Sequence, residues 1–127
     1  MAMRRTVTTS DAPLSTSPVS QATVGAGLVF VGGQMPRDMA TGRIVEGIEA
    51  QTRLSLHYCM QILRAAGAKP ENVLLATVFL TDLAAKDIVN SVFREVFPAN
   101  PPARNLVEVS QIGEGAVVEV SVIAMLG

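Results

Sequence analysis

The stretch Val73-Leu74-Leu75-Ala76-Thr77-Val78-Phe79-Leu80-Thr81 decides the fold. It is apolar at nearly every position and partly β-branched, which is typical of a strand whose two faces are both covered. We therefore expect a central strand, with helices against one face and a partner against the other.

Two amphipathic segments flank this strand. The segment before it has apolar residues at steps of three and four, which predicts a long helix that ends at Gly67. These residues are Ile48, Thr52, Leu56, Cys59, Ile62, Leu63 and Ala66. The segment after it predicts a second helix, with Asp82 as its N-cap and Pro98 as its terminator. Its apolar stripe is Ala85, Ile88, Val89, Val92 and Val96.

Three further strands are expected, at Leu28–Val31, Ala103–Val109 and Val117–Met125. Gly32-Gly33 closes the first of them, which indicates either a simple bulge or a place where another backbone or a ligand comes close. In the last strand, alternation places Glu119 among apolar neighbours on the face opposite the valines. The order of elements predicts an α+β domain over residues 1–127, with two helices on one face of a mixed sheet.

Composition limits the classes of function. With 127 residues the chain has the length of one domain, and 49% hydrophobic residues against 17% charged residues indicate that another subunit covers apolar surface. The net charge of −1 gives no basic surface for a nucleic-acid backbone. With no Trp, one Tyr and four Phe, the chain also has few aromatic residues on which bases could stack. No apolar run approaches the ~20 residues of a membrane span, and the start lacks the apolar core of a secretory signal, so we expect a cytoplasmic protein.

The chain has few residues that could bind a metal ion or form a disulfide. Cys59 is the only cysteine and His57 the only histidine, which excludes an internal disulfide and a zinc site of the Cys/His type. Cys59 falls in the first predicted helix, where a buried structural thiol is expected. No metal or cofactor is predicted.

Arg104 is the unusual residue of the strand that begins at Ala103. A guanidinium keeps its charge and presents a rigid fork of donors, so on a half-buried strand it needs an anion, and a carboxylate fits the fork best. Arg104 is therefore a candidate carboxylate clamp. The alternatives are a solvated side chain or a structural ion pair with Glu108 or Glu119.

Seven segments of the chain share their order and spacing with one protein family. They are Ala12-Pro13, Pro18–Ala22, Leu28–Pro36, Gln51–Arg53, Thr77–Leu83, Val89-Asn90 and Pro102–Val109. Through them the chain resembles the Rid (YjgF) family of small enamine/imine deaminases over nearly its whole length.

The resemblance implies a chorismate-mutase-like domain that forms a homotrimer with a central barrel and clefts between subunits. It implies that Arg104 binds the substrate carboxylate at a subunit interface, that Glu119 positions or activates water, and that the backbone at Gly33 or Asn105 meets the ligand. The implied reaction is hydrolysis of small 2-imino or enamine acids, of the 2-aminoacrylate type, to 2-keto acids and ammonia without a cofactor.

The chain departs from the family pattern at three places in or near the cleft. Val19 stands where many members have a tyrosine, Leu106 where they have a small or thiol residue, and Lys86 where an aromatic residue is frequent. The pocket is then more apolar, and the substrate range is expected to shift. A trimer that binds small carboxylates without catalysis is the alternative function. Ribonuclease activity, attached to some relatives, is disfavoured by the neutral charge and the single histidine.

Overall fold

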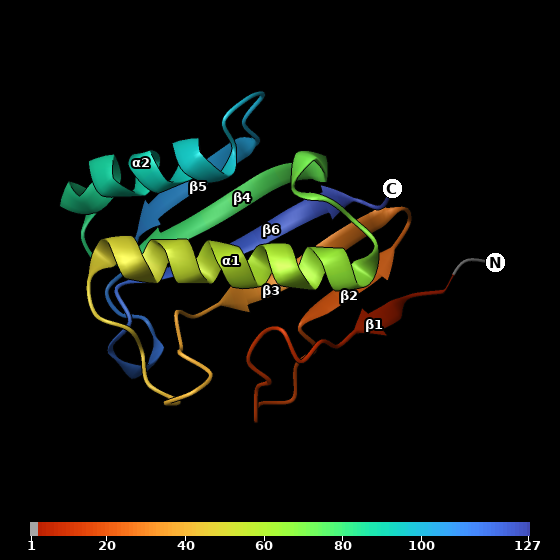
Figure 1. Cartoon of the computed structure of the whole chain (residues 1–127), viewed down its shortest axis with the longest axis horizontal. Coiled ribbons are helices and arrows are strands. Elements are labelled where there is room, and N and C mark those ends of the chain that lie inside the picture. Colours follow the sequence, from red (N-terminus) through yellow and green to blue (C-terminus); the bar gives the residue numbers. More distant parts are fainter. Residues whose placement is uncertain (1–2) are drawn as a thin grey trace.

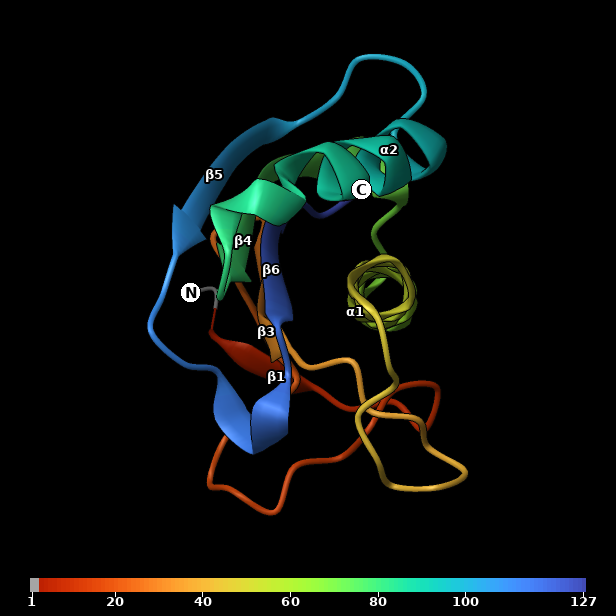
Figure 2. The same ribbon diagram turned by 90° about the vertical axis from the view of Figure 1, so that its left-hand side faces the viewer.

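The computed structural model describes residues 3–127 as a six-stranded sheet with two helices on one face (Figures 1 and 2). The strands are β1 (Arg5–Val7), β2 (Ala22–Gly25), β3 (Leu28–Gln34), β4 (Val73–Leu80), β5 (Ala103–Glu108) and β6 (Val118–Met125). Their order is β1-β2-β3-β6-β4-β5, and only β4 and β5 pair in parallel. The predicted mixed sheet with two helices on one face is confirmed. Residues 1 and 2 of the predicted domain lie outside the described residues.

β4 lies inside the sheet, between β5 and β6. Its side chains on the helix-covered face, Ala76, Val78 and Leu80, are completely buried. The side chains between them, Thr77 and Phe79, are only half-buried in the single chain. The second cover expected from the sequence is therefore not supplied by residues 3–127, and we call this side of the sheet the open face.

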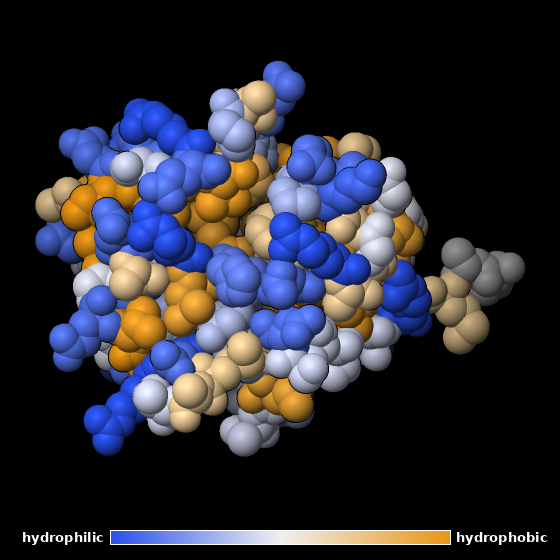
Figure 3. All heavy atoms as spheres, viewed as in Figure 1, coloured by the Kyte–Doolittle hydropathy of each residue, from blue (hydrophilic) through white to orange (hydrophobic). Residues whose placement is uncertain are grey.

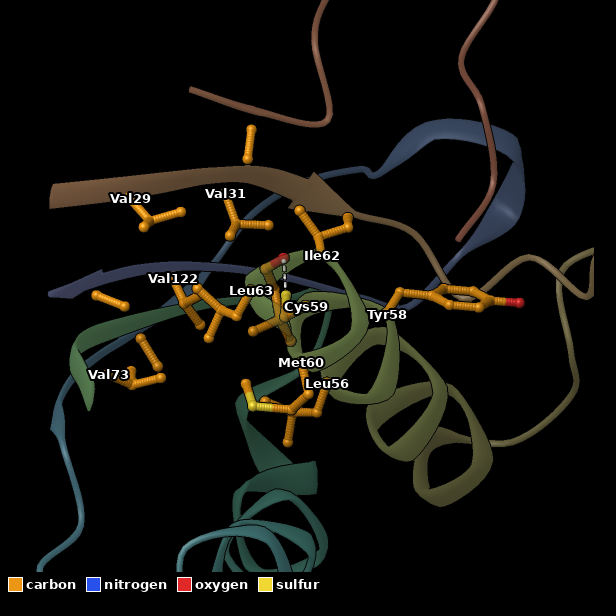
Figure 4. Packing of buried hydrophobic residues seen from close by; sticks show 14 of the residues in the cluster. Val29, Val31, Leu56, Tyr58, Cys59, Met60, Ile62, Leu63, Val73 and Val122 are labelled. Atoms are coloured by element: carbon orange, nitrogen blue, oxygen red, sulfur yellow. Dashed lines mark hydrogen bonds between the residues drawn. The ribbon is translucent and has the colours of Figure 1, made fainter. Parts of the chain in front are cut away.

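The core lies between the sheet and helix α1 (Ile48–Ala66) (Figure 4). The helix has the bounds predicted, and it ends at Gly67, whose φ of 93° suits a residue without a Cβ. Cys59 is buried as predicted, and its thiol donates to the carbonyl oxygen of Val120 at 3.4 Å. Complete burial raises the pKa of this thiol, so it is unreactive.

Helix α2 (Lys86–Val96) differs from its prediction at one margin. Ile88, placed in the apolar stripe, is 39% exposed, while Phe93 is buried in its stead. At 100° per residue these two side chains lie at opposite edges of the stripe, and the helix rests on the Phe93 side. The predicted cap is present in a different form, because the Asp82 carboxylate accepts from the backbone of Ala84 and begins a short 3-10 turn before the helix.

The two helices present polar outer surfaces, with apolar atoms between them (Figure 3). Within residues 3–127, neither helix is long and apolar enough to cross a bilayer.

The side chain of Gln21 holds the first part, Thr9 to Pro13, of the loop of residues 8–21 between β1 and β2. Its Oε1 accepts from the backbone N–H of Thr9 at 2.7 Å, and its Nε2 donates to the carbonyls of Thr9, Ala12 and Pro13 at 3.1, 3.2 and 3.0 Å. A single buried amide thus replaces the backbone ladder that a longer hairpin would have.

We predict that Gln21→Leu lowers the free energy of unfolding by about 1–3 kcal/mol, because it leaves buried backbone groups of the loop without partners. Urea unfolding followed by circular dichroism measures the change. Gln111→Leu, at an exposed position, is the matched control and should leave stability nearly unchanged. Equal effects of the two substitutions would contradict the role given to Gln21.

Candidate functional site

Arg104 lies on the edge strand β5 and faces the helices. It pairs with Ala76 of β4, whose side chain is on the helix-covered face, and paired residues of neighbouring strands share a face. Its guanidinium carbon lies 4.9 Å from the centre of the Phe93 ring on α2. The arginine is half-buried between the edge of the sheet and this helix.

The charge of Arg104 has no counter-ion in the described part of the chain. The ion pairs among residues 3–127 are Arg37 with Glu114 and Arg53 with Glu49 and Glu95. Glu108 instead accepts from the backbone N–H of Leu83 at 2.9 Å. The structural ion pair with Glu108 or Glu119 is therefore wrong for the single chain, and burial alone lowers the pKa of Arg104.

Glu119 lies on the open face of β6, opposite Phe79 of β4. The register between β3 and β6 shifts between Val31 and Gln34, so the bulge considered for Gly32-Gly33 is present. A Cβ at Gly33 would lie 2.9 Å from Cδ of Glu119, closer than packed atoms allow. Glycine thus lets the carboxylate rest against the backbone, and burial raises the pKa of Glu119.

The remaining predicted residues are spread over both faces. Asn105 pairs with Thr77 and is exposed on the open face, while Leu106 pairs with Val78 and packs against the core. Val19 is 66% exposed in the loop of residues 8–21.

Val19 lines a wide hollow of about 700 Å³ in which Arg4, Phe30 and Gly32 also take part. Lys86, in the first turn of α2, is exposed.

One chain therefore brings together Gly33 and Glu119, but not Arg104 and Glu119. The side chains of Arg104 and Glu119 point to opposite faces of the sheet. Their strands, β5 and β6, are separated by β4. Because neighbouring strands are about 4.8 Å apart, β5 and β6 lie about 10 Å apart. Phe93 is not among the residues expected from the sequence, because the apolar stripe predicted for the second helix runs along the Ile88 side. Among residues 3–127, no three His, Cys, Asp or Glu side chains gather as metal ligands would.

We predict that the stability of the wild type relative to Glu119→Gln falls as pH rises above about 4, the ordinary range for glutamate. A raised folded-state pKa means that the folded chain binds the proton more tightly, so this stability is present below the unfolded-state pKa and is lost as pH rises through the folded one. Urea unfolding at a series of pH values measures the difference. The exposed Glu71→Gln is the control, and the same pH profile for both variants would oppose the prediction.

Comparisons with known proteins agree with this architecture. The family model described as Endoribonuclease L-PSP matches residues 9–126. The RutC family protein of Sulfurisphaera tokodaii is 42% identical, over 96% of this chain and 98% of that protein. The 2-iminobutanoate/2-iminopropanoate deaminase of Salmonella typhimurium is 34% identical, over 97% and 98%.

A solved structure extends the likeness to three dimensions. The crystal structure of E. coli TdcF with bound serine matches with a TM-score of 0.92 at 31% identity, covering 97% of this chain and 99% of that one. The sequence matches and the structural match both cover almost the entire chain, and the resemblance found in the sequence is confirmed. The chain belongs to the Rid (YjgF) family, whose model carries the Endoribonuclease L-PSP description.

Proposed function

We propose that this protein hydrolyses small 2-imino or enamine acids to 2-keto acids and ammonia, and that Arg104 clamps the substrate carboxylate. The observation that carries the proposal is a half-buried guanidinium with no acid within 4 Å of it among residues 3–127. A relative of 34% identity is named for this reaction, and TdcF holds serine, a small 2-amino acid.

The proposed chemistry needs few groups. The imine carbon C2 is already an electrophile, so water adds to it once the substrate is held in place. The fork of Arg104 makes two charge-assisted hydrogen bonds to the carboxylate and so fixes C2. Glu119, whose raised pKa favours carrying a proton, passes one proton of the added water to the nitrogen to give a carbinolamine, and then passes the remaining hydroxyl proton to the same nitrogen. The C2–N bond then breaks, the C2=O bond forms, and ammonia leaves.

We propose further that the complete site forms where copies of the chain meet in a homotrimer. The side chains of Arg104 and Glu119 point to opposite faces of one sheet, so a site that uses both would combine the Arg104 of one copy with the Glu119 of another. The open face offers the apolar surface for such contact, since Phe30, Val107 and Met125 are 44%, 41% and 46% exposed.

The same proposal gives roles to the remaining predicted residues. Backbone donors at Gly33 and Asn105 meet the developing polar centre at C2. Val19 and Leu106 make the walls of the site apolar, which favours substrates with short aliphatic side chains.

We predict that Arg104→Ala lowers kcat/KM for short 2-imino acids by at least about 100-fold, because two charge-assisted hydrogen bonds are lost. The imino acids are generated in situ with an amino-acid oxidase, and their loss is followed by trapping with semicarbazide. Arg43→Ala, at an exposed position, is the control and should match the wild type.

The same experiment separates catalysis from binding alone. One outcome is that the wild-type protein does not accelerate loss of the imino acids above the uncatalysed background but is still stabilised against heat by 2-oxobutyrate. That result would favour the non-catalytic carboxylate-binding trimer. An Arg104→Ala variant as active as the wild type would remove the clamp from the mechanism.

We predict that Phe30→Asp converts the trimer to monomers, because it buries a carboxylate in the apolar contact between open faces. Light scattering coupled to size exclusion measures the mass. Met39→Asp, which changes an equally exposed methionine in the loop between β3 and α1, should remain a trimer. A wild type that elutes as a monomer at micromolar concentration would contradict the proposed assembly.

A further inference from the structure

We propose that Phe93 is a positioning residue for Arg104, holding the guanidinium against its ring so that every N–H donor stays available to the substrate. This inference rests on the proposed function, since it concerns the same carboxylate clamp.

The geometry is that of a cation over an aromatic face. The guanidinium carbon lies 4.9 Å from the ring centre, inside the roughly 6 Å range over which a ring attracts a cation. The contact joins α2 to the edge strand β5, so it fixes the arginine to an element outside its own strand. Within residues 3–127 the guanidinium makes neither a hydrogen bond nor an ion pair.

A ring serves this purpose better than an acid would. A carboxylate partner could also hold the arginine, but it would occupy the donors of the fork and cancel the charge that the substrate must meet. The ring contact uses the charge without consuming an N–H group. The incoming carboxylate then meets a guanidinium that is already oriented, and less side-chain entropy is lost on binding.

The ring itself is held firmly. Phe93 is only 8% exposed and packs against Phe97, with ring centres 5.7 Å apart and the planes tilted by 43°. Phe97 is also 8% exposed, and it provides a comparison because its ring is equally buried and, among residues 3–127, no arginine lies over it.

The test compares Phe93→Leu, Phe93→Tyr and Phe97→Leu for KM and kcat with short 2-imino acids, and for the Kd of 2-oxobutyrate. We expect Phe93→Leu to raise KM and Kd by about 2- to 30-fold, the range of a cation–ring contact, with a smaller change in kcat. Phe93→Tyr keeps the ring and should behave like the wild type. Phe97→Leu, which only loosens the support of the Phe93 ring, should raise KM and Kd less than Phe93→Leu does, and an equal rise there would overturn the proposal in favour of simple packing.

A second measurement covers the case in which Phe93→Leu fails to fold. Site-specific incorporation of 3,4,5-trifluorophenylalanine at position 93 keeps the shape of the ring but withdraws charge from its face. It should also raise KM and Kd, and unchanged values in this folded variant would overturn the proposal.

The Arg104→Ala background separates this inference from the proposed function. There, Phe93→Leu should cause no further rise in Kd, because the group it positions is gone. Loss of activity in Arg104→Ala, together with wild-type values in Phe93→Leu and in the trifluorophenylalanine variant, would overturn the positioning role alone. Unchanged activity in Arg104→Ala would remove the proposed carboxylate clamp as well.

Discussion

The packing of α1 on the valine face of β6 is the contact on which the rest of the structure depends. Val118, Val120, Val122 and Ala124 are almost completely buried against the helix layer, and Cys59 reaches the backbone of the same strand. Because side chains of a strand alternate, burying these four residues forces the others to the open face. Glu119 is therefore placed by the core, and a slip of one residue would exchange it with a valine.

Arg104 is placed by a different constraint. β5 is an edge strand that pairs only with β4, so its helix-facing side chains lie at the border of the core rather than inside it. There a long side chain can pack its stem against the protein and keep its charge near water. One charged residue thus lies at the edge strand on the helix-covered side, and the other lies on the open face, so that only the contact between copies proposed above would make them neighbours.

The sequence predicts elements well where one local signal decides them. The bounds of α1 follow from its repeat and from Gly67, β4 follows from its continuous apolar run, and β6 follows from its alternation. β1 and β2 were missed because three or four residues carry too little pattern, and their pairing depends on partners distant in the chain. Ile88 was misplaced because a helical stripe has a width, and only tertiary contact decides which margin is buried.

The candidate site was predictable as a set of residues but not as an arrangement. An arginine and a glutamate among apolar neighbours stand out in the sequence, whereas the cross-strand register that puts Glu119 beside Gly33 does not. From the sequence, Phe93 is indistinguishable from an ordinary core residue, and only the structure shows that its ring lies against the Arg104 guanidinium.

The amide of Gln21 has a consequence for how this fold can diversify. Its four hydrogen bonds hold the first part of the loop of residues 8–21 through backbone atoms of Thr9, Ala12 and Pro13. Further along the same loop, the side chains of Leu14 and Val19 are 66% exposed. Substitutions at these exposed positions can therefore change the surface of the loop while its backbone keeps the same path.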